Sequence, residues 1–186
     1  MKTIKLLLIS TFILTFSFTS FAGGKYGLRA GYQLSNVYKG GATLNADGLN
    51  SFYAGMFTEQ RIVPMLFFGS GSEYSQIGSM TNADNKLVMH YVGIPTYLKL
   101  KIGPVYAIAG ATANFLVWEQ HFYEDAPLDP YEDAGWFDIP VFASVGVQIL
   151  MIRIEARYNW GTFDLYKSPN EGYKNQFLQL GLAVAL

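Results

Sequence analysis

The strongest constraint on the fold is a strict alternation of apolar and polar residues toward the C-terminus. Between positions 152 and 160 every second residue is apolar: Ile152, Ile154, Ala156, Tyr158 and Trp160. The residues between them are charged or polar: Arg153, Glu155, Arg157 and Asn159. A helix would scatter these charges around its axis, whereas a strand places them all on one side. The segment is therefore predicted to be a strand with one apolar and one charged face.

Eight segments of the chain carry this period of two. They lie at about 25–36, 49–60, 64–78, 87–101, 104–118, 136–149, 151–161 and 174–186. Strands of soluble proteins usually have about 5–6 residues. A tilted strand that crosses a bilayer needs roughly 9–11 residues, which is the length found here.

The connections between these segments alternate in length. Long ones lie at about 37–48, 79–86, 119–135 and 162–173, and short ones at 61–64, 102–104 and position 150. An even strand number with short turns at one end and long loops at the other is typical of bacterial outer-membrane barrels. We therefore predict an all-β fold, a transmembrane up-and-down antiparallel β-barrel of eight strands.

Composition agrees with a partly lipid-covered surface. Hydrophobic residues make up 51% of the chain and charged residues 15%, against about 25% charged in soluble domains. The formal net charge is −1, so the basic excess of a nucleic-acid-binding protein is absent. The chain has no cysteine, which excludes thiolate catalysis and thiolate metal sites.

The N-terminus has the features of a secretory signal peptide. Lys2 and Lys5 precede an uncharged apolar run at positions 6–18, and Ser20 and Ala22 are the small residues of a cleavage site. The predicted organisation is a signal peptide at 1–22 and a barrel domain at 23–186. We expect export through the signal peptide to the outer membrane of a Gram-negative cell envelope.

Strand parity places nine charged residues on the face opposite the apolar one. A charge on the lipid face costs roughly 2–4 kcal/mol at the midplane of the bilayer, so these residues are expected to point into the barrel. They are Arg29, Glu59, Glu73, Lys99, Lys101, Asp138, Arg153, Glu155 and Arg157. The interior of an eight-stranded barrel is just wide enough for side chains. We expect these charges to pair and close the lumen; the alternative is a narrow pore for ions or small solutes.

A soluble periplasmic barrel that binds a hydrophobic ligand is a further alternative. Such a barrel would be apolar inside and polar outside. The uniformly apolar faces of this chain are aliphatic, with aromatic residues near their ends: Tyr26, Trp118, Phe137 and Trp160. Aromatic girdles around an aliphatic band are typical of a lipid-facing wall.

The third long connection combines acidic and aromatic residues. The candidate partner-contact loop consists of Trp118, Glu119, Phe122, Tyr123, Glu124, Asp125, Asp129, Tyr131, Glu132, Asp133 and Trp136. Aromatic anchors are common in protein interfaces, although a solvated loop has the same composition. The loop lacks the D-x-D-x-D-G spacing of a calcium loop. We predict no metal and no cofactor.

Features of an enzyme are scarce. The two histidines are His90, which parity places on the lipid side, and His121, which lies in the long connection. An enzyme acting on outer-membrane lipids would need a histidine with a serine and a carboxylate. Here only His90 with Ser75 or Ser79 and Asp84 could supply them. We predict no catalytic residues and keep a lipid-modifying enzyme as an alternative.

The segments resemble the small outer-membrane β-barrel family called PorT-like, or "porin family", which is common in Bacteroidota. The resemblance covers nearly the whole chain after position 22. It is carried in order by 27–36 (GLRAGYQLSN), 74–78 (YSQIG), 91–95 (YVGIP) with Leu98 and Lys99, Gly103-Pro104, 154–159 (IEARYN) with Gly161, and 177–181 (FLQLG). The resemblance implies an outer-membrane barrel and little about its activity.

The C-terminus is similar to a barrel-assembly signal. The matching residues are Gln179, Gly181, Val184 and Leu186. The resemblance implies an encounter with the barrel-assembly machinery. We expect a non-enzymatic outer-membrane protein with a structural or interaction role, such as an accessory subunit of a larger complex. Its expected partners are outer-membrane lipid, lipopolysaccharide and an outer-membrane protein, and no nucleic acid.

Overall fold

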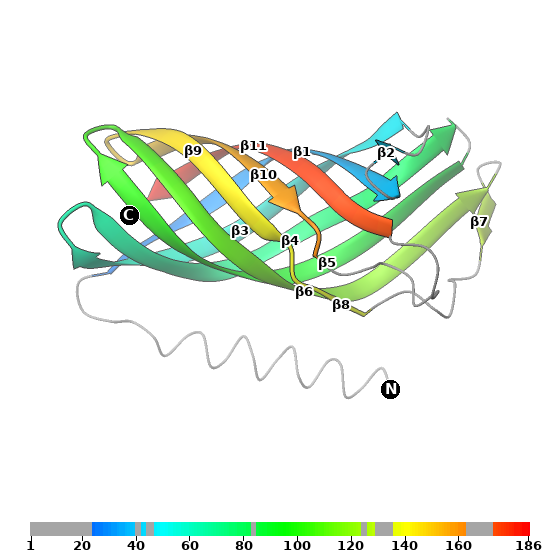
Figure 1. Ribbon diagram of the computed structural model, residues 1–186, viewed down its shortest axis with the longest axis horizontal. Helices are drawn as coiled ribbons and strands as arrows, with labels where there is room; N and C mark the ends of the chain where they lie inside the picture. The colour runs from blue at the N-terminus through cyan, green and yellow to red at the C-terminus, as the bar shows by residue number, and fades with distance from the viewer. Residues whose placement is uncertain are drawn as a thin grey trace.

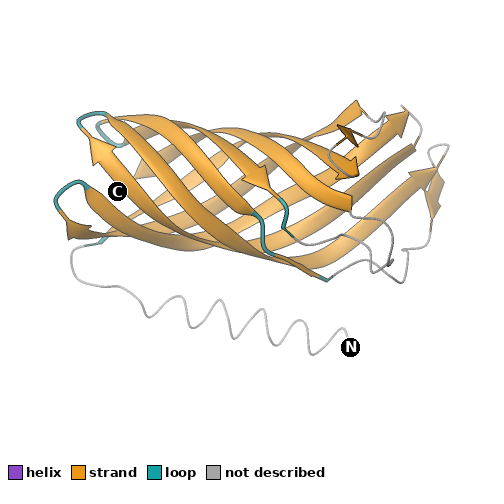
Figure 2. Cartoon of the chain, viewed as in Figure 1, coloured by secondary structure: helices purple, strands orange, loops and turns teal. Residues whose placement is uncertain are grey.

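The protein forms a single closed sheet (Figures 1 and 2). The computed structural model describes residues 24–39, 42–43, 47–82, 85–123, 126–128, 136–162 and 173–186. The predicted signal peptide lies outside these residues. The described part of the chain contains no helix that is long and apolar enough to cross a membrane.

Eight long strands make the barrel wall. They are β1 (Lys25–Lys39), β3 (Asp47–Val63), β4 (Leu66–Asn82), β5 (Asn85–Ile102), β6 (Val105–Tyr123), β9 (Val141–Ile149), β10 (Ile152–Trp160) and β11 (Tyr173–Ala185). Each is antiparallel to its neighbours. Strand β11 pairs with β1 from Gly27↔Ala185 to Lys39↔Tyr173, which closes the ring. The predicted antiparallel eight-stranded barrel is confirmed.

The wall is taller on one side than on the other. Strands β3 to β6 have 17 to 19 residues, whereas β9 and β10 have 9 each. Figure 1 shows β6, together with the short strand β7 (Ala126–Leu128), extending past the end of β9. Two further short strands, β2 (Ala42–Thr43) and β8 (Phe137–Asp138), pair with β1 and β6.

Three two-residue turns join the strands at the opposite end of the barrel. The closing pairs are Val63↔Leu66, Ile102↔Val105 and Ile149↔Ile152. One residue of each turn has a left-handed backbone: Met65 (φ 73°), Gly103 (φ 61°) and Leu150 (φ 54°). Only glycine adopts this conformation without steric cost. The short connections at 102–104 and at 150 were thus predicted in place, whereas β3 continues through most of the predicted connection 61–64 to Val63. Two of the three turns have a non-glycine residue in the left-handed position.

Two of the predicted long loops are wrong in extent. Strands β4 and β5 continue to the pair Asn82↔Asn85, so most of 79–86 lies in a hairpin. Strand β6 continues to Tyr123 and pairs with β7. Segment 79–86 is mainly polar, so it gives no apolar periodicity. Backbone hydrogen bonds between paired strands do not require this periodicity, so β4 and β5 continue without it.

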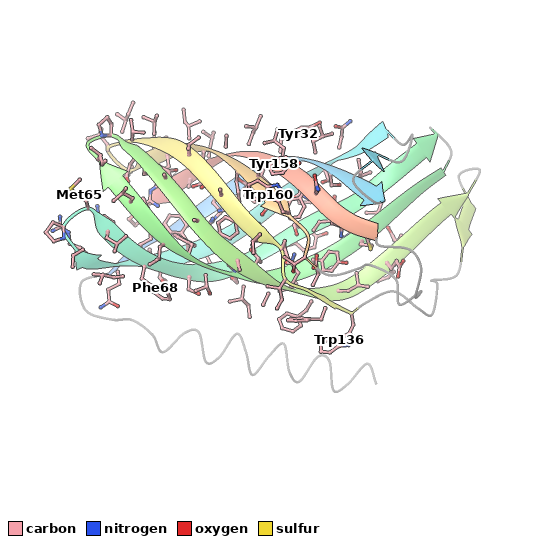
Figure 3. All side chains as sticks on the ribbon, in the orientation of Figure 1. Tyr32, Met65, Phe68, Trp136, Tyr158 and Trp160 are labelled. Atoms are coloured by element: carbon pink, nitrogen blue, oxygen red, sulfur yellow. The ribbon has the colours of Figure 1, made fainter. Side chains whose placement is uncertain are left out.

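The two faces of the wall differ as strand parity predicted. Apolar side chains cover the outside along all eight strands, among them Leu28, Met56, Phe68, Leu98, Val145, Ile154 and Leu182. Figure 3 shows Tyr32, Phe68 and Trp136 pointing away from the barrel. Buried polar and charged side chains, including Arg29, Gln33, Glu59, Lys99, Arg157 and Gln179, lie on the inside.

Candidate functional site

The interior of the barrel contains two connected tiers of charged side chains. The tier nearer the turns centres on Glu59 of β3. Arg153 of β10 donates to both oxygens of this carboxylate, with Nη1–Oε1 at 2.7 Å and Nη2–Oε2 at 2.8 Å. Lys99 of β5 lies on the same carboxylate, with Nζ–Oε2 at 3.0 Å. The Tyr97 hydroxyl donates to Oε1 at 3.1 Å. Glu59 thus joins three strands.

The second tier centres on Arg157 of β10, whose side chain is 1% exposed. Its Nη1 is 3.2 Å from Glu73 Oε2 on β4, and its Nη2 is 2.9 Å from Glu155 Oε1. Glu155 also accepts from the Tyr106 hydroxyl at 3.1 Å. Gln179 Nε2 donates to Glu73 Oε1 at 3.0 Å. Each carboxylate of this tier therefore has at least two donors.

Arginine and lysine also lie against aromatic rings between the tiers. The Cζ atoms of Arg29 and Arg153 are 5.0 and 4.7 Å from the centre of the Phe57 ring. Arg157 lies over Phe142 at 4.5 Å, and the Lys99 ammonium lies over Tyr106 at 4.4 Å. A cation over a ring face is attracted by the ring quadrupole, and the attraction strengthens where water is excluded. The rings therefore stabilise cations that are buried in a narrow space.

Arg29 connects the two tiers. Its Nη1 is 3.9 Å from Glu73 Oε2, and its Nη2 is 3.5 Å from the Tyr97 hydroxyl, which donates a hydrogen bond to Glu59. A cavity of about 10 Å³ lies among Arg29, Glu59, Arg153 and Glu155. This volume is about that needed by one water molecule. The tiers thus leave little open space at this level.

An apolar layer lies on the loop side of the charged tiers. Ile77, Met89, Tyr91 and Phe177 form a buried cluster, and Leu116 packs against it. Between this layer and Glu73, a polar chain runs from Gln33 to Gln179 to Asn159, with the Gln179 Nε2–Gln33 Oε1 distance at 2.9 Å. The lumen is therefore filled in succession by charged, amide and apolar side chains.

The structure brings together seven of the nine predicted lumen charges: Arg29, Glu59, Glu73, Lys99, Arg153, Glu155 and Arg157. Lys101 lies nearer the turns and donates to Gln148 Oε1 at 2.9 Å. Asp138 is buried on β8, opposite Asn114 of β6.

Sequence reasoning missed the uncharged partners of these groups. They are Tyr97, Tyr106, Phe57, Phe142, Gln33 and Gln179. Gln33, Phe57 and Tyr97 have the same strand parity as Arg29, Glu59 and Lys99 of their strands. For these three, parity was a signal that could have found them.

The candidate partner-contact loop is in part a strand, which corrects the prediction. Trp118, Glu119, Phe122 and Tyr123 belong to β6. Trp118 is 62% exposed, whereas Glu119 is 8% exposed. Trp136 is exposed and packs beside Phe115 and Phe137, with ring centres 6.3 and 5.6 Å away. The other predicted members, Glu124, Asp125, Asp129, Tyr131, Glu132 and Asp133, lie outside the described residues.

The residues considered for an enzyme do not all meet. Ser75 is buried in the lumen, on the same face as its partner Tyr91, whereas the half-buried His90 ring contacts Tyr74 of the outer face. The wall therefore separates Ser75 from His90. The side chains of Ser79, Asp84 and His121 are outside the described part of the structure. Within that part, no group of three His, Asp or Glu residues could hold a metal ion.

Three of the four residues of the predicted assembly signal lie on the last strand, and Leu186 directly follows it. Gln179 is buried inside the barrel, and Val184 and Leu186 are exposed on the outside near the turns. Gly181 lies between the Tyr53 hydroxyl and the backbone of β1, where a side chain would not fit. Gln179 and Gly181 thus also have a packing role inside the barrel.

Comparisons with known proteins support the fold. No protein-family model and no curated protein matches the chain. The attachment invasion locus protein Ail of Yersinia pestis, solved with the heparin analogue sucrose octasulfate, is 15% identical with a TM-score of 0.54. The match covers 89% of this chain and 100% of Ail. A structure of Ail in a phospholipid bilayer nanodisc gives a TM-score of 0.52 at 14% identity, covering 88% of this chain and 99% of Ail.

Neisserial surface protein A is similar in the same way. It is 11% identical with a TM-score of 0.59, and the match covers 88% of this chain and 99% of that protein. At such identities the likeness concerns the fold alone. The chain has the fold of the small eight-stranded outer-membrane β-barrel proteins.

Proposed function

We propose that the protein is a non-enzymatic integral outer-membrane barrel whose lumen is closed by its paired charges. Its role is structural or interactive, and it is a small barrel of the PorT-like type. The observation that carries the proposal is the pair of tiers built on Glu59 and Arg157, which cross the lumen from several strands. Paired charges with further hydrogen-bond donors are stable inside a narrow barrel, whereas unpaired ones would not be.

The outer wall supports a membrane location. Its exposed apolar side chains are found on strands around the whole ring, among them Leu28 on β1, Phe68 on β4, Val105 on β6 and Ile154 on β10. Monomeric soluble proteins rarely expose apolar patches larger than a few hundred Å². A soluble barrel that binds a hydrophobic ligand would also need an apolar cavity, but charged and amide side chains fill this lumen over much of its length. We also propose that residues 1–22 are a signal peptide that directs export.

The test of closure is single-channel recording in planar bilayers with the full-length mature barrel. Because two charged tiers and the apolar layer of Ile77, Met89, Tyr91 and Phe177 fill the lumen, we expect no conductance steps above the bare bilayer. A matched control is the barrel with Arg153→Ala and Phe57→Ala, which removes two large side chains from one tier. Steady conductance by the unaltered barrel would establish the narrow pore instead.

The interaction role is tested by purifying a tagged copy from native envelopes in mild detergent. A protein that co-purifies in fixed ratio would identify an accessory subunit of a complex. Its loss on Trp136→Ala, with retention on Trp160→Ala, would place the contact at the predicted partner-contact loop, of which Trp136 is a member. A barrel recovered alone would leave the lipid-facing wall as its interaction surface. Recovery without detergent would contradict the membrane location.

A further inference from the structure

A small group of polar and aromatic side chains interrupts the apolar outer wall. We name Phe52, Tyr74, Gln76, His90 and Trp118 the His90 patch. Gln76, His90 and Trp118 are direct cross-strand neighbours on β4, β5 and β6. Tyr74 lies between Phe52 and His90, with ring centres 5.9 and 6.0 Å away. Phe52 and Trp118 are more than half exposed.

Hydrogen bonds within the patch engage one nitrogen of the histidine ring. Gln76 Nε2 donates to the Tyr74 hydroxyl at 3.2 Å, and this hydroxyl is 2.6 Å from His90 Nδ1. The hydroxyl has one hydrogen and two lone pairs, so it donates to Nδ1 or accepts from it according to the tautomer of the ring. In both tautomers Nδ1 is engaged by Tyr74, and Nε2 is left for a further hydrogen bond.

Two polar atoms of the patch remain available to a ligand. Among the described residues, neither His90 Nε2 nor Gln76 Oε1 has a hydrogen-bond partner, and both side chains are half-buried rather than enclosed. Oε1 accepts, Nε2 donates or accepts according to the tautomer, and the two atoms lie on neighbouring strands. The exposed Trp118 ring lies next to them on β6. The patch thus combines two polar atoms with a flat apolar ring.

The patch lies at the outer boundary of the apolar band. His90 is 12 positions along β5 from Ile102 at the turn end. With a rise of about 3.3 Å per residue and a strand tilt near 40°, this places it about 30 Å above the turns. The apolar band of such barrels is about 25 Å tall. The neighbours of the His90 patch are therefore the headgroups of the outer leaflet rather than acyl chains.

We propose that the His90 patch binds the sugar headgroup of a glycolipid in the outer leaflet. A sugar ring offers hydroxyls, which both donate and accept, to Nε2 and Oε1, and an apolar C–H face to Trp118. The patch contains no Lys or Arg in its described residues, so it lacks the cation that a phosphate group would pair with. This inference rests on the proposed outer-membrane location and adds a ligand class to it.

Native mass spectrometry of the full-length barrel in mild detergent tests the proposal. The probes are lipid A, lipid A without its phosphates, phosphatidylglycerol and a soluble core oligosaccharide. We expect both forms of lipid A to bind with similar Kd, and neither phosphatidylglycerol nor the free oligosaccharide to bind comparably. His90→Phe and Trp118→Leu should each weaken binding about tenfold, the effect of losing roughly one good contact. Trp160→Leu, on β10, is the matched control and should not change the Kd.

Each other result would overturn the inference. If lipid A without its phosphates no longer bound, the ligand would be the phosphate groups. If the free oligosaccharide bound as well as lipid A, the ligand would be a soluble sugar rather than a glycolipid. Equal Kd values for all variants would place the ligand elsewhere. Folding of each variant is checked by its heat-dependent mobility on gels. A barrel that is membrane-inserted and non-conducting but binds no glycolipid would remove this inference and leave the proposed function intact.

Discussion

Arg157 and Glu73 meet across the full width of the barrel. Their strands, β10 and β4, lie on opposite sides of the eight-membered ring, and Nη1 of the arginine is 3.2 Å from Oε2 of the glutamate. The same guanidinium bonds Glu155 on its own strand at 2.9 Å. One cation, whose side chain is 1% exposed, therefore holds two carboxylates inside the lumen.

Replacing Arg157 by methionine should destabilise the barrel strongly. The Arg157→Met side chain keeps most of the volume but leaves Glu73 and Glu155 without their shared cation. Removing one member of a buried ion pair costs about 3–5 kcal/mol. The free energy of unfolding in urea, followed by tryptophan fluorescence in detergent, should fall by this amount.

The control for Arg157 is Arg61→Met. Arg61 is exposed at the turn end and contacts the ring of Phe67 at 5.9 Å. Exposed charges contribute about 0–1 kcal/mol. If the two variants lost equal stability, or if Arg157→Met lost none, the charged tiers would not hold the wall together.

Strand parity in the sequence was enough to predict which face of β10 carries Arg153, Glu155 and Arg157. It could not predict that Arg157 meets Glu73 rather than Glu59. That choice depends on the stagger of strands far apart in the chain. A shift of two residues preserves the parity and changes every partner. The aromatic partners were missed for another reason. Tyrosine is also typical of the aromatic girdles on a lipid-facing wall, so the residue type alone does not show that Tyr97 and Tyr106 lie inside the barrel.

The outer end of the barrel shows a different limit of the sequence. Segment 79–86 is too polar to show a period of two, yet β4 and β5 pair as far as Asn82↔Asn85. Outside the bilayer a ladder needs only backbone hydrogen bonds, so hydropathy carries no information about it. The acidic residues of the partner-contact loop remain a prediction.

Gly69 leaves the space that the Tyr97 ring occupies. A Cβ at Gly69 would overlap the far end of this ring, whose hydroxyl donates to Glu59 at 3.1 Å. Gly69→Ala should therefore push the ring away and cost about 1–3 kcal/mol. In a barrel that already carries Tyr97→Leu, Gly69→Ala should cost less free energy of unfolding than it does in the unaltered barrel. A double-mutant cycle in urea measures the coupling, and purely additive effects would contradict the overlap.

Leu150 has a strained backbone conformation in the turn between β9 and β10. Its φ of 54° is in the left-handed region, which costs an ordinary residue about 1–2 kcal/mol. Asparagine tolerates this region better. Leu150→Asn and Met151→Asn both remove an exposed apolar side chain from the same turn, but only the first relieves a left-handed backbone. Leu150→Asn should therefore lose about 1 kcal/mol less of the free energy of unfolding in detergent than Met151→Asn. Equal losses would show that no strain is relieved at Leu150.

The apolar turns should lie within the membrane rather than in water. Leu150 is 89% exposed, and Met65, Ile102 and Met151 are exposed at the same end of the barrel. Figure 3 shows Met65 at this end. Burying apolar area gains about 25 cal/mol per Å², so these tips favour lipid. Since His90 lies about 30 Å above the turns and the band is about 25 Å tall, a band that ends below His90 begins within about 5 Å of the tips.

The absence of cysteine in the chain makes this immersion directly measurable. A fluorophore on Leu150→Cys, in liposomes, should be quenched by brominated acyl chains and protected from aqueous iodide. The control is Thr162→Cys, because Thr162 is exposed beyond β10 at the loop end; it should show the reverse. If iodide quenched both positions equally, the turns would project into water. The exposed apolar tips would then require a protein to cover them.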